Sequence, residues 1–178
     1  MKFKKIQLNG FKSFAERTDF LIESGLTGIV GPNGCGKSNI VESLRWCMGE
    51  NSAKSMRGSG MEDVIFSGTS NRPSKNISEV ALLLDNQNKE GPSHYKEFDE
   101  ISVRRKIEKD KGSKYFINDK EVRARDVQTL FADLSTGAHS PSMISQGRIG
   151  ALVTAKPTDR RAILEEAAGI SGIHVRRH

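Results

Sequence analysis

The 178-residue sequence predicts an α/β fold that combines a mixed sheet with an antiparallel β layer. Three observations lead to this prediction: an apolar strand that runs into a glycine-rich loop and a helix, a later series of closely spaced strands, and a length suited to one domain or one lobe of a larger domain. Apolar residues that alternate or run together indicate strands, and apolar residues that recur every three or four positions indicate helices.

The first part of the chain is expected to be strand, strand, strand, loop and helix. Residues 3–8 alternate like a half-buried strand, and apolar runs at 20–22 and 26–30 indicate two more strands. The run at 26–30 leads directly into a glycine loop, and the apolar spacing over 40–48 then indicates an amphipathic helix.

The rest of the chain is expected to contain shorter strands and two further helices. In order, these are an exposed loop at 52–60, a short strand at 63–66, a strand at 79–85, a polar insert at 86–99, two strands with a short turn at 101–108 and 114–118, and helices at 125–134 and 157–169. Neighbouring strands with short connections imply an antiparallel layer.

The glycine loop carries the strongest chemical signal. Residues 31–38, GPNGCGKS, match the pattern G-x-x-x-x-G-K-S, and they lie between a predicted strand and a predicted helix as this motif requires. Glycines let backbone N–H groups approach phosphate, and the helix N-terminus favours negative charge. We therefore expect a P-loop NTPase fold that binds ATP and Mg²⁺, with Lys37 at the terminal phosphates and the Ser38 hydroxyl on the metal.

Hydrolysis also requires an acidic residue at the end of a buried strand and a group that positions water. Asp85 ends an apolar strand, but Asn86 follows it where a water-activating glutamate would be expected, and aspartate is common at strand ends for local hydrogen bonding. We do not assign Asp85 a catalytic role.

Several separated segments together resemble one family. They are NGFKSF at 9–14, GPNGCGKSN at 31–39, MRG at 56–58, MEDVIFSG at 61–68, ISQG at 144–147, and DRR with EEAAGI within 159–170. In this order and spacing they resemble the N-terminal head segment of bacterial chromosome-partitioning SMC proteins.

The resemblance implies half of an ABC-type ATPase head. Residues 1–170 would form the N-terminal lobe, and 171–178 would begin a neck that leads to a coiled coil. In this family the magnesium-binding aspartate, the catalytic glutamate and the signature motif lie in the C-terminal half, so we expect no catalytic residue here. The implied function is ATP binding that drives head engagement in chromosome condensation, organisation and segregation, with negligible hydrolysis by this chain alone.

The resemblance also implies the site residues, position by position. Magnesium would be held by Ser38 and by Gln146 in the Q-loop. The nucleotide would be contacted by Lys12, Ser13, Pro32, Asn33, Gly34, Cys35, Gly36, Lys37, Ser38, Asn39, Arg57 and Asp63.

The charge balance favours a polyanionic partner. Basic residues exceed acidic ones, 28 against 22, and the isoelectric point is about 9.4. Strand alternation places Arg104 and Lys106 on one face and Arg105 on the other. Our DNA-binding candidates are Arg104, Lys106, Arg123 and Arg125. We expect these side chains to contact the phosphate backbone of duplex DNA regardless of its base sequence. A merely solvated basic hairpin is the alternative.

Further partners follow from the resemblance: the C-terminal half of the same head, a second copy joined through a hinge outside this chain, and a kleisin subunit with its winged-helix partner.

The two cysteines suit neither a disulfide framework nor a zinc site, and no apolar run is long enough to span a bilayer. We expect a cytoplasmic, nucleoid-associated protein with no membrane partner.

Four alternatives remain open from the sequence. The chain could belong to a DNA-repair ATPase of the same head group, an ABC transporter subunit, a self-contained small-molecule phosphotransferase, or a non-catalytic DNA-binding module with a vestigial loop. A phosphotransferase would need an acceptor-binding lid and a complete acidic site, and neither is evident in the sequence.

Overall fold

The computed structural model describes residues 2–25, 27–89, 91–134, 156 and 158. The described elements are β1 (Lys2–Asn9), β2 (Thr18–Leu21), α1 (Lys37–Cys47), the 3-10 turn η1 (Met61–Val64), β3 (Ile77–Asp85), the 3-10 turn η2 (Ser93–Tyr95), β4 (Glu100–Glu108), β5 (Gly112–Ile117), β6 (Lys120–Val122) and α2 (Ala124–Asp133).

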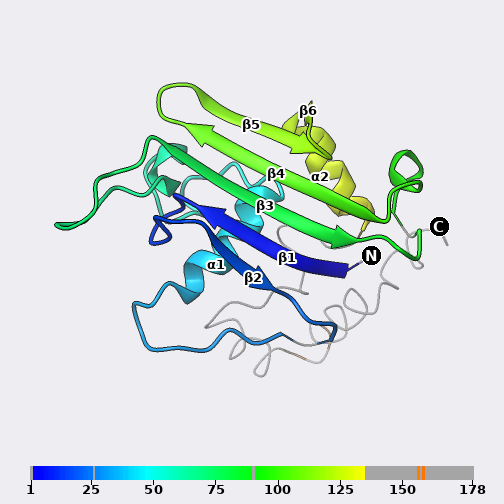
Figure 1. The fold of residues 1–178 in the computed structure, drawn as a ribbon, viewed down its shortest axis with the longest axis horizontal. Coiled ribbons are helices and arrows are strands. Elements are labelled where there is room, and N and C mark those ends of the chain that lie inside the picture. The colour runs from blue at the N-terminus through cyan, green and yellow to red at the C-terminus, as the bar shows by residue number, and fades with distance from the viewer. Residues whose placement is uncertain (1, 26, 90, 135–155, 157, 159–178) are drawn as a thin grey trace.

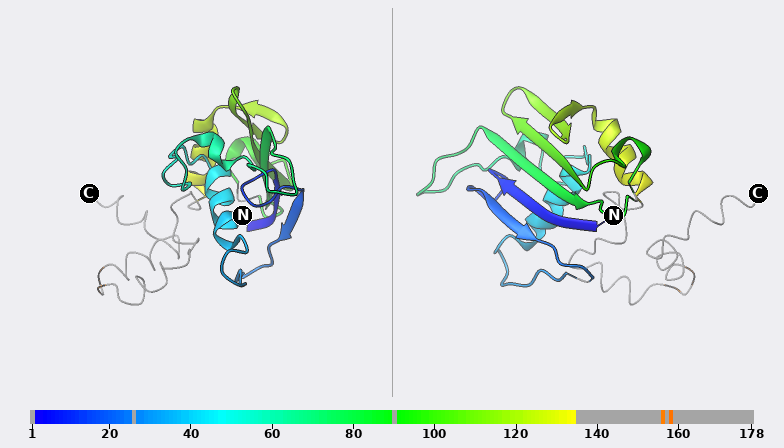
Figure 2. Two further views of the ribbon diagram at one scale, coloured as in Figure 1. Left: turned by 90° about the vertical axis from the view of Figure 1, so that its left-hand side faces the viewer. Right: turned by 45° about the vertical axis from the view of Figure 1, so that its right-hand side comes forward.

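The strands form one six-stranded sheet in the order β2-β1-β3-β4-β5-β6, and each of these pairings is antiparallel (Figure 1). Both helices lie on the same side of this sheet (Figure 2). The expected α/β fold with an antiparallel β layer is confirmed, whereas the described strands form no parallel pair and therefore no mixed sheet.

The core lies between the sheet and the helices, because the strand residues alternate between the two faces. Buried and half-buried residues follow one another along β3 and β4. The inward-facing residues Leu82 and Val103 pack in the same cluster as Trp46 of α1 and Phe131 of α2, and all four are almost completely buried. The burial pattern along these strands therefore identifies the inner face of the sheet.

One buried cation fixes the C-terminal end of α1 to the sheet. Arg105 projects inward from β4, is 2% exposed, and donates hydrogen bonds to the carbonyl oxygens of Trp46 (2.8 Å) and Glu50 (2.7 Å). Its guanidinium carbon lies 4.4 Å from the ring centroid of Trp46 and 4.7 Å from that of Tyr115. Burial lowers the pKa of Arg105 from its usual value. The helix that follows the glycine loop is thus held at its far end.

The strand expected at 26–30 is not formed by the described residues 27–30, so this prediction is wrong for the described chain. These residues have no regular structure, and Ile29 and Val30 are 42% and 93% exposed. A strand needs a neighbour that completes its hydrogen bonds, and neither edge strand of the described sheet, β2 or β6, pairs with this segment. An apolar run indicates a segment that favours burial, but it does not indicate which partner buries it.

Two smaller predictions also require correction. The expected strand at 63–66 is instead the turn η1 followed by Ile65 and Phe66, and the buried residues there are consecutive rather than alternating. The strand β6 was not predicted, although Asn118 and Asp119 form a two-residue turn with φ values of 47° and 63° before it. Asparagine and aspartate tolerate this conformation, so the signal was present.

The remaining elements agree with the sequence apart from their ends. The strands expected at 3–8, 20–22, 79–85, 101–108 and 114–118 correspond to β1 to β5, and the helices at 40–48 and 125–134 correspond to α1 and α2. The helix expected at 157–169 and the loop that contains Gln146 lie outside the described residues.

Candidate nucleotide-binding site

The glycine loop opens helix α1 with two glycines in the left-handed region. Gly34 has a φ of 83°, and Gly36, the residue before the helix, has a φ of 95°. A Cβ on Gly36 would lie 2.9 Å from the Ser13 hydroxyl oxygen, so both conformation and space favour glycine there. No side chain caps the start of α1, and its first turn contains no acidic residue. The first N–H groups of the helix are therefore available to an anion.

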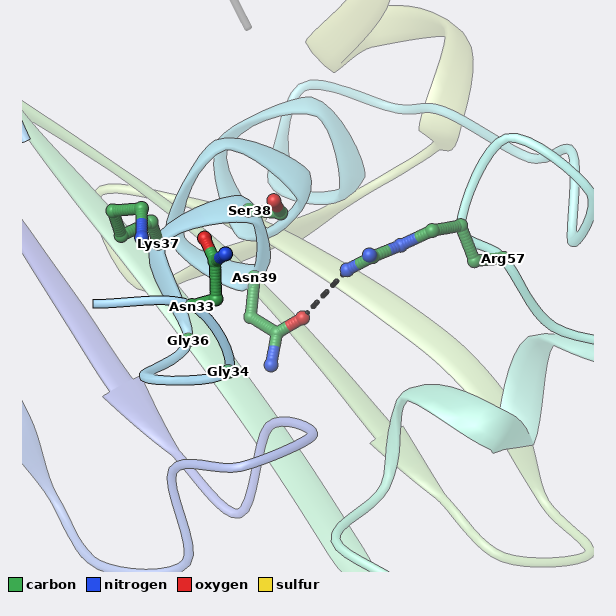
Figure 3. A pocket seen from close by; sticks show the side chains of 7 residues that line it. All are labelled: Asn33, Gly34, Gly36, Lys37, Ser38, Asn39 and Arg57. Carbon is green, nitrogen blue, oxygen red and sulfur yellow. Dashed lines mark hydrogen bonds between the residues drawn. The ribbon is translucent and has the colours of Figure 1, made fainter. Parts of the chain in front are cut away.

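A pocket of about 210 Å³ lies at this helix start. Its described lining residues come from the glycine loop, the first turn of α1 and the loop that follows α1, and none of them is acidic (Figure 3). They are Asn33, Gly34, Gly36, Lys37, Ser38, Asn39 and Arg57.

Lys37 folds back over its own loop. Its ammonium donates hydrogen bonds to the carbonyl oxygens of Gly31 (2.5 Å) and Pro32 (2.6 Å). The side chain spans the loop that would surround a phosphate, and its charge lies at the pocket wall. Both carbonyl bonds are replaceable by a phosphate oxygen, which is the stronger, charged acceptor.

Arg57 reaches the pocket from the loop that follows α1. One terminal nitrogen of its guanidinium donates to Asn39 Oδ1 at 2.8 Å (Figure 3). The Asn39 amide nitrogen in turn donates to the Ser13 hydroxyl at 2.8 Å. These two bonds connect three segments that are distant in sequence, and all three residues were predicted to contact nucleotide.

Glu42 was missed by the sequence analysis. It is 7% exposed on α1, and its carboxylate forms ion pairs with both Lys12 and Arg57. The Lys12 ammonium also donates to the Met56 carbonyl oxygen. Lys12 is thus engaged within the chain and is not among the residues that line the pocket. The available signal was helical spacing, because Glu42 follows Ser38 by four positions and Asn39 by three.

Asp63 lies outside the set of residues that line the pocket, and its carboxylate is used locally. Asp63 Oδ2 accepts hydrogen bonds from the backbone N–H groups of Ser59 (2.6 Å) and Gly60 (2.9 Å). These bonds, that from Gly60 first, lower the pKa of the Asp63 carboxyl. The carboxylate stabilises the loop between Arg57 and η1, and its expected contact with nucleotide stays a prediction.

Two other predicted residues belong to the loop without lining the pocket. The Pro32 carbonyl accepts from Lys37, and Cys35 is an exposed free thiol. The proposed magnesium ligand Gln146 lies outside the described residues. Within the described part of the chain, no three His, Cys, Asp or Glu side chains are grouped as a metal site.

The four DNA-binding candidates occupy different environments. Arg104 faces away from the helices and pairs with Glu79 at 3.2 Å and Asp119 at 3.3 Å. Lys106 is half-buried two residues further along β4, whereas Arg123 and Arg125 at the start of α2 are exposed. The predicted alternation is confirmed, since Arg105 projects to the opposite, inner face.

None of the helices in the described residues combines the length and the apolar character that crossing a bilayer would require.

Comparison with known proteins defines the family. Residues 2–148 match the model of the RecF/RecN/SMC N terminal domain, and the chain belongs to this family. It is 59% identical over its whole length to the chromosome partition protein Smc of Cereibacter sphaeroides, and 56% identical to that of Rhodopseudomonas palustris. It spans only 16% and 15% of these relatives.

Solved structures of SMC heads agree with this family assignment. A structure of an Smc head bound to the C-terminal winged-helix domain of ScpA matches with a TM-score of 0.81 and 30% identity, over 96% of this chain and 52% of that one. Another, from work on ATP-driven dimerization and DNA-stimulated activation of SMC ATPases, matches with a TM-score of 0.77 and 28% identity, over 94% of this chain and 99% of that one. The predicted resemblance to SMC heads is confirmed.

Proposed function

We propose that this chain is the ATP-binding half of an SMC-type ATPase head. The observation that supports this most strongly is the uncapped start of α1, which opens into a pocket lined by Lys37, Ser38 and Arg57. Backbone N–H groups and the positive end of the helix favour phosphate there, and Lys37 supplies a mobile charge for the terminal phosphates.

The Ser38 hydroxyl would hold magnesium together with nucleotide oxygens, and Gln146 would add a second protein oxygen. The donor set fits this ion, because magnesium keeps several waters and is commonly bound through substrate phosphates and few protein groups. When bound, magnesium supplies charge neutralisation at the phosphates. Without nucleotide, one serine hydroxyl among the described residues makes a weak site.

The C-terminal half of the same head completes the fold in this proposal. Residues 27–30 form an apolar segment immediately before the phosphate loop, and Val30 is 93% exposed. A strand from the other half would pair with this segment, bury Ile29 and Val30, and fix the glycine loop on a parallel sheet. The C-terminal half would also contribute the acidic pair and the signature motif, so the isolated chain binds ATP weakly and hydrolyses it negligibly.

The wider role that we propose is chromosome condensation, organisation and segregation. ATP drives engagement of two heads, a kleisin subunit joins them, and duplex DNA is bound through its backbone. The exposed Arg123 and Arg125 suit a phosphate contact better than Arg104, whose charge is already paired with two carboxylates.

Reconstitution tests this function. The chain is mixed with the C-terminal half of its head, and phosphate release is measured with and without duplex DNA. We expect turnover only in the mixture, and loss of that turnover with Lys37→Ala. Robust turnover by the chain alone would contradict the proposal, and salt-dependent DNA binding that ignores both ATP and Lys37→Ala would favour a non-catalytic DNA-binding module.

A further inference from the structure

Glu42 is a buried carboxylate that contacts two cations from two different loops. One oxygen, Oε2, pairs with the Lys12 ammonium in the loop between β1 and β2, and the other, Oε1, pairs with Arg57 Nε in the loop after α1. The Glu42 side chain is 9% exposed and that of Lys12 is 13% exposed, but that of Arg57 is 58% exposed. Of these three side chains, only that of Arg57 is exposed enough to move from the ion-pair cluster into solvent.

The position of Glu42 on α1 relates it directly to the pocket. It lies one helical turn beyond Ser38 and Asn39, on the same side of the helix. Asn39 and Glu42 therefore hold the same guanidinium, Asn39 through a terminal nitrogen at 2.8 Å and Glu42 through Nε. An arginine has five N–H donors, so other donors stay available to a ligand in the pocket that Arg57 lines.

We propose that Glu42 is a positioning residue that holds the Arg57 guanidinium at the phosphate pocket before nucleotide arrives. This inference rests on the proposed nucleotide site. An anion then meets an arginine that is already oriented, which avoids the cost of ordering a long exposed side chain during binding. Lys12 contributes through Glu42, because its ammonium pairs with the buried carboxylate and offsets part of the cost of removing that charge from water.

A neutral side chain at position 42 would release Arg57 rather than Lys12. A glutamine has one acceptor oxygen where the carboxylate has two, and its amide nitrogen would face a cation. Lys12 keeps its bond to the Met56 carbonyl and is mostly buried, whereas Arg57 is exposed and repelled by the uncompensated Lys12. We therefore expect the affinity for nucleotide to fall. The loss of an oriented Arg57 weakens binding more than the added local positive charge, from removing one carboxylate, strengthens it.

The test is a double-mutant cycle on the 178-residue chain, with affinity measured by fluorescence titration of mant-ATP in the presence of magnesium. We expect Glu42→Gln and Arg57→Ala each to weaken binding by about tenfold, as is typical when one charged hydrogen-bonding partner is lost. The double variant should also be weaker by about tenfold, not by the roughly hundredfold of independent effects. Glu100→Gln is the matched control, because its carboxylate pairs with a lysine, Lys4, on a different part of the sheet.

Two results would overturn the inference. In one, Glu42→Gln lowers the unfolding temperature but leaves the affinity for mant-ATP unchanged, which is the behaviour of a purely structural ion pair. In the other, the effects of Glu42→Gln and Arg57→Ala multiply. If Lys37→Ala binds mant-ATP as tightly as the wild type, the proposed nucleotide site itself is wrong, and this outcome is distinguishable from both.

A measurement on the unaltered chain covers the case in which Glu42→Gln does not fold. The exchange of the Arg57 Nε–H proton with solvent is followed by ¹⁵N NMR without nucleotide. We expect this proton to exchange at least about tenfold more slowly than that of the exposed Arg17, whose Nε lies 3.6 Å from a carboxylate that is itself 41% exposed. Equal exchange rates would show that Glu42 does not hold Arg57, and the inference would be wrong.

Discussion

Replacement of Arg105 by leucine would detach the C-terminal end of α1 from the sheet. The guanidinium donates to the carbonyl oxygens of Trp46 and Glu50, and its carbon lies 4.4 Å from the ring centroid of Trp46 and 4.7 Å from that of Tyr115. It is 2% exposed, so water does not replace these contacts in the folded chain. A leucine fills part of the volume but provides no donor.

The magnitude follows from opposing contributions. Two hydrogen bonds from a charged donor contribute about 3–6 kcal/mol together, and two cation–π contacts add about 1–4 kcal/mol. Burying the guanidinium costs the wild type several kcal/mol of desolvation free energy. The leucine variant does not have this cost, which offsets part of the loss. We therefore expect Arg105→Leu to lower the free energy of unfolding by about 3 kcal/mol, a large fraction of the stability of a domain.

Urea unfolding followed by tryptophan fluorescence measures this change, because Trp46 is the single tryptophan and is fully buried beside Arg105. The control is Arg104→Leu, one residue earlier on the outer face, where partly exposed ion pairs contribute about 0–1 kcal/mol. Equal losses for the two variants, or a loss below about 1 kcal/mol for Arg105→Leu, would refute the reasoning.

Three further predictions concern the loops and cysteines. Gly36→Ala should weaken mant-ATP binding and lower stability by about 1–2 kcal/mol, whereas Gly60→Ala, with φ −136° and no atom within 4 Å of its Cβ, should change neither. Folding lowers the pKa of the Asp63 carboxyl from its ordinary value of 3.8. Its contribution to stability is therefore complete at pH values above 3.8 and is lost as the pH falls through the lower pKa of the folded state. Acid unfolding curves of wild type and Asp63→Asn should therefore converge at low pH and diverge above it. Burial raises the pKa of the Cys47 thiol to about 12, so iodoacetamide should label Cys35 alone in the folded chain and both cysteines after unfolding, as counted by mass spectrometry; rapid labelling of folded Cys47 would contradict the fold.

The sheet was predictable because its strands bury one face. The alternation along residues 101–108 predicted that Arg104 and Arg105 project from opposite faces, and the burial pattern of β4 agrees with this. What alternation did not reveal is that the inward Arg105 is compatible with the core, because its bonding partners lie in α1 and in the loop just after it, more than fifty residues away. Sequence patterns predict the face, but not the contacts that make a buried charge stable.

The pocket at the start of α1 was predictable because its geometry is local. The glycines, Lys37 and Ser38 are consecutive, and their conformations follow from the need for positive φ and a free helix start. Arg57 was expected there only through the family resemblance, and the structure places it on the pocket wall.

Glu42 was not predicted because its role depends on Lys12 and Arg57 together, which lie thirty residues before it and fifteen after it. The strand at 26–30 failed for a related reason. Its apolar residues imply burial, yet the described part of the chain supplies no strand to pair with 27–30. Where structure depends on a distant or separate partner, local sequence is insufficient.

The most direct test of the central claim is the affinity of the chain for magnesium and mant-ATP, compared between wild type and Lys37→Ala. Lys120→Ala, which changes an exposed lysine on β6, is the control for loss of one positive charge. We expect saturable binding by the wild type and the control, and binding weaker by at least about tenfold for Lys37→Ala, since a charged contact to phosphate is lost. Equal affinities for all three proteins would contradict the claim that the glycine loop holds the nucleotide.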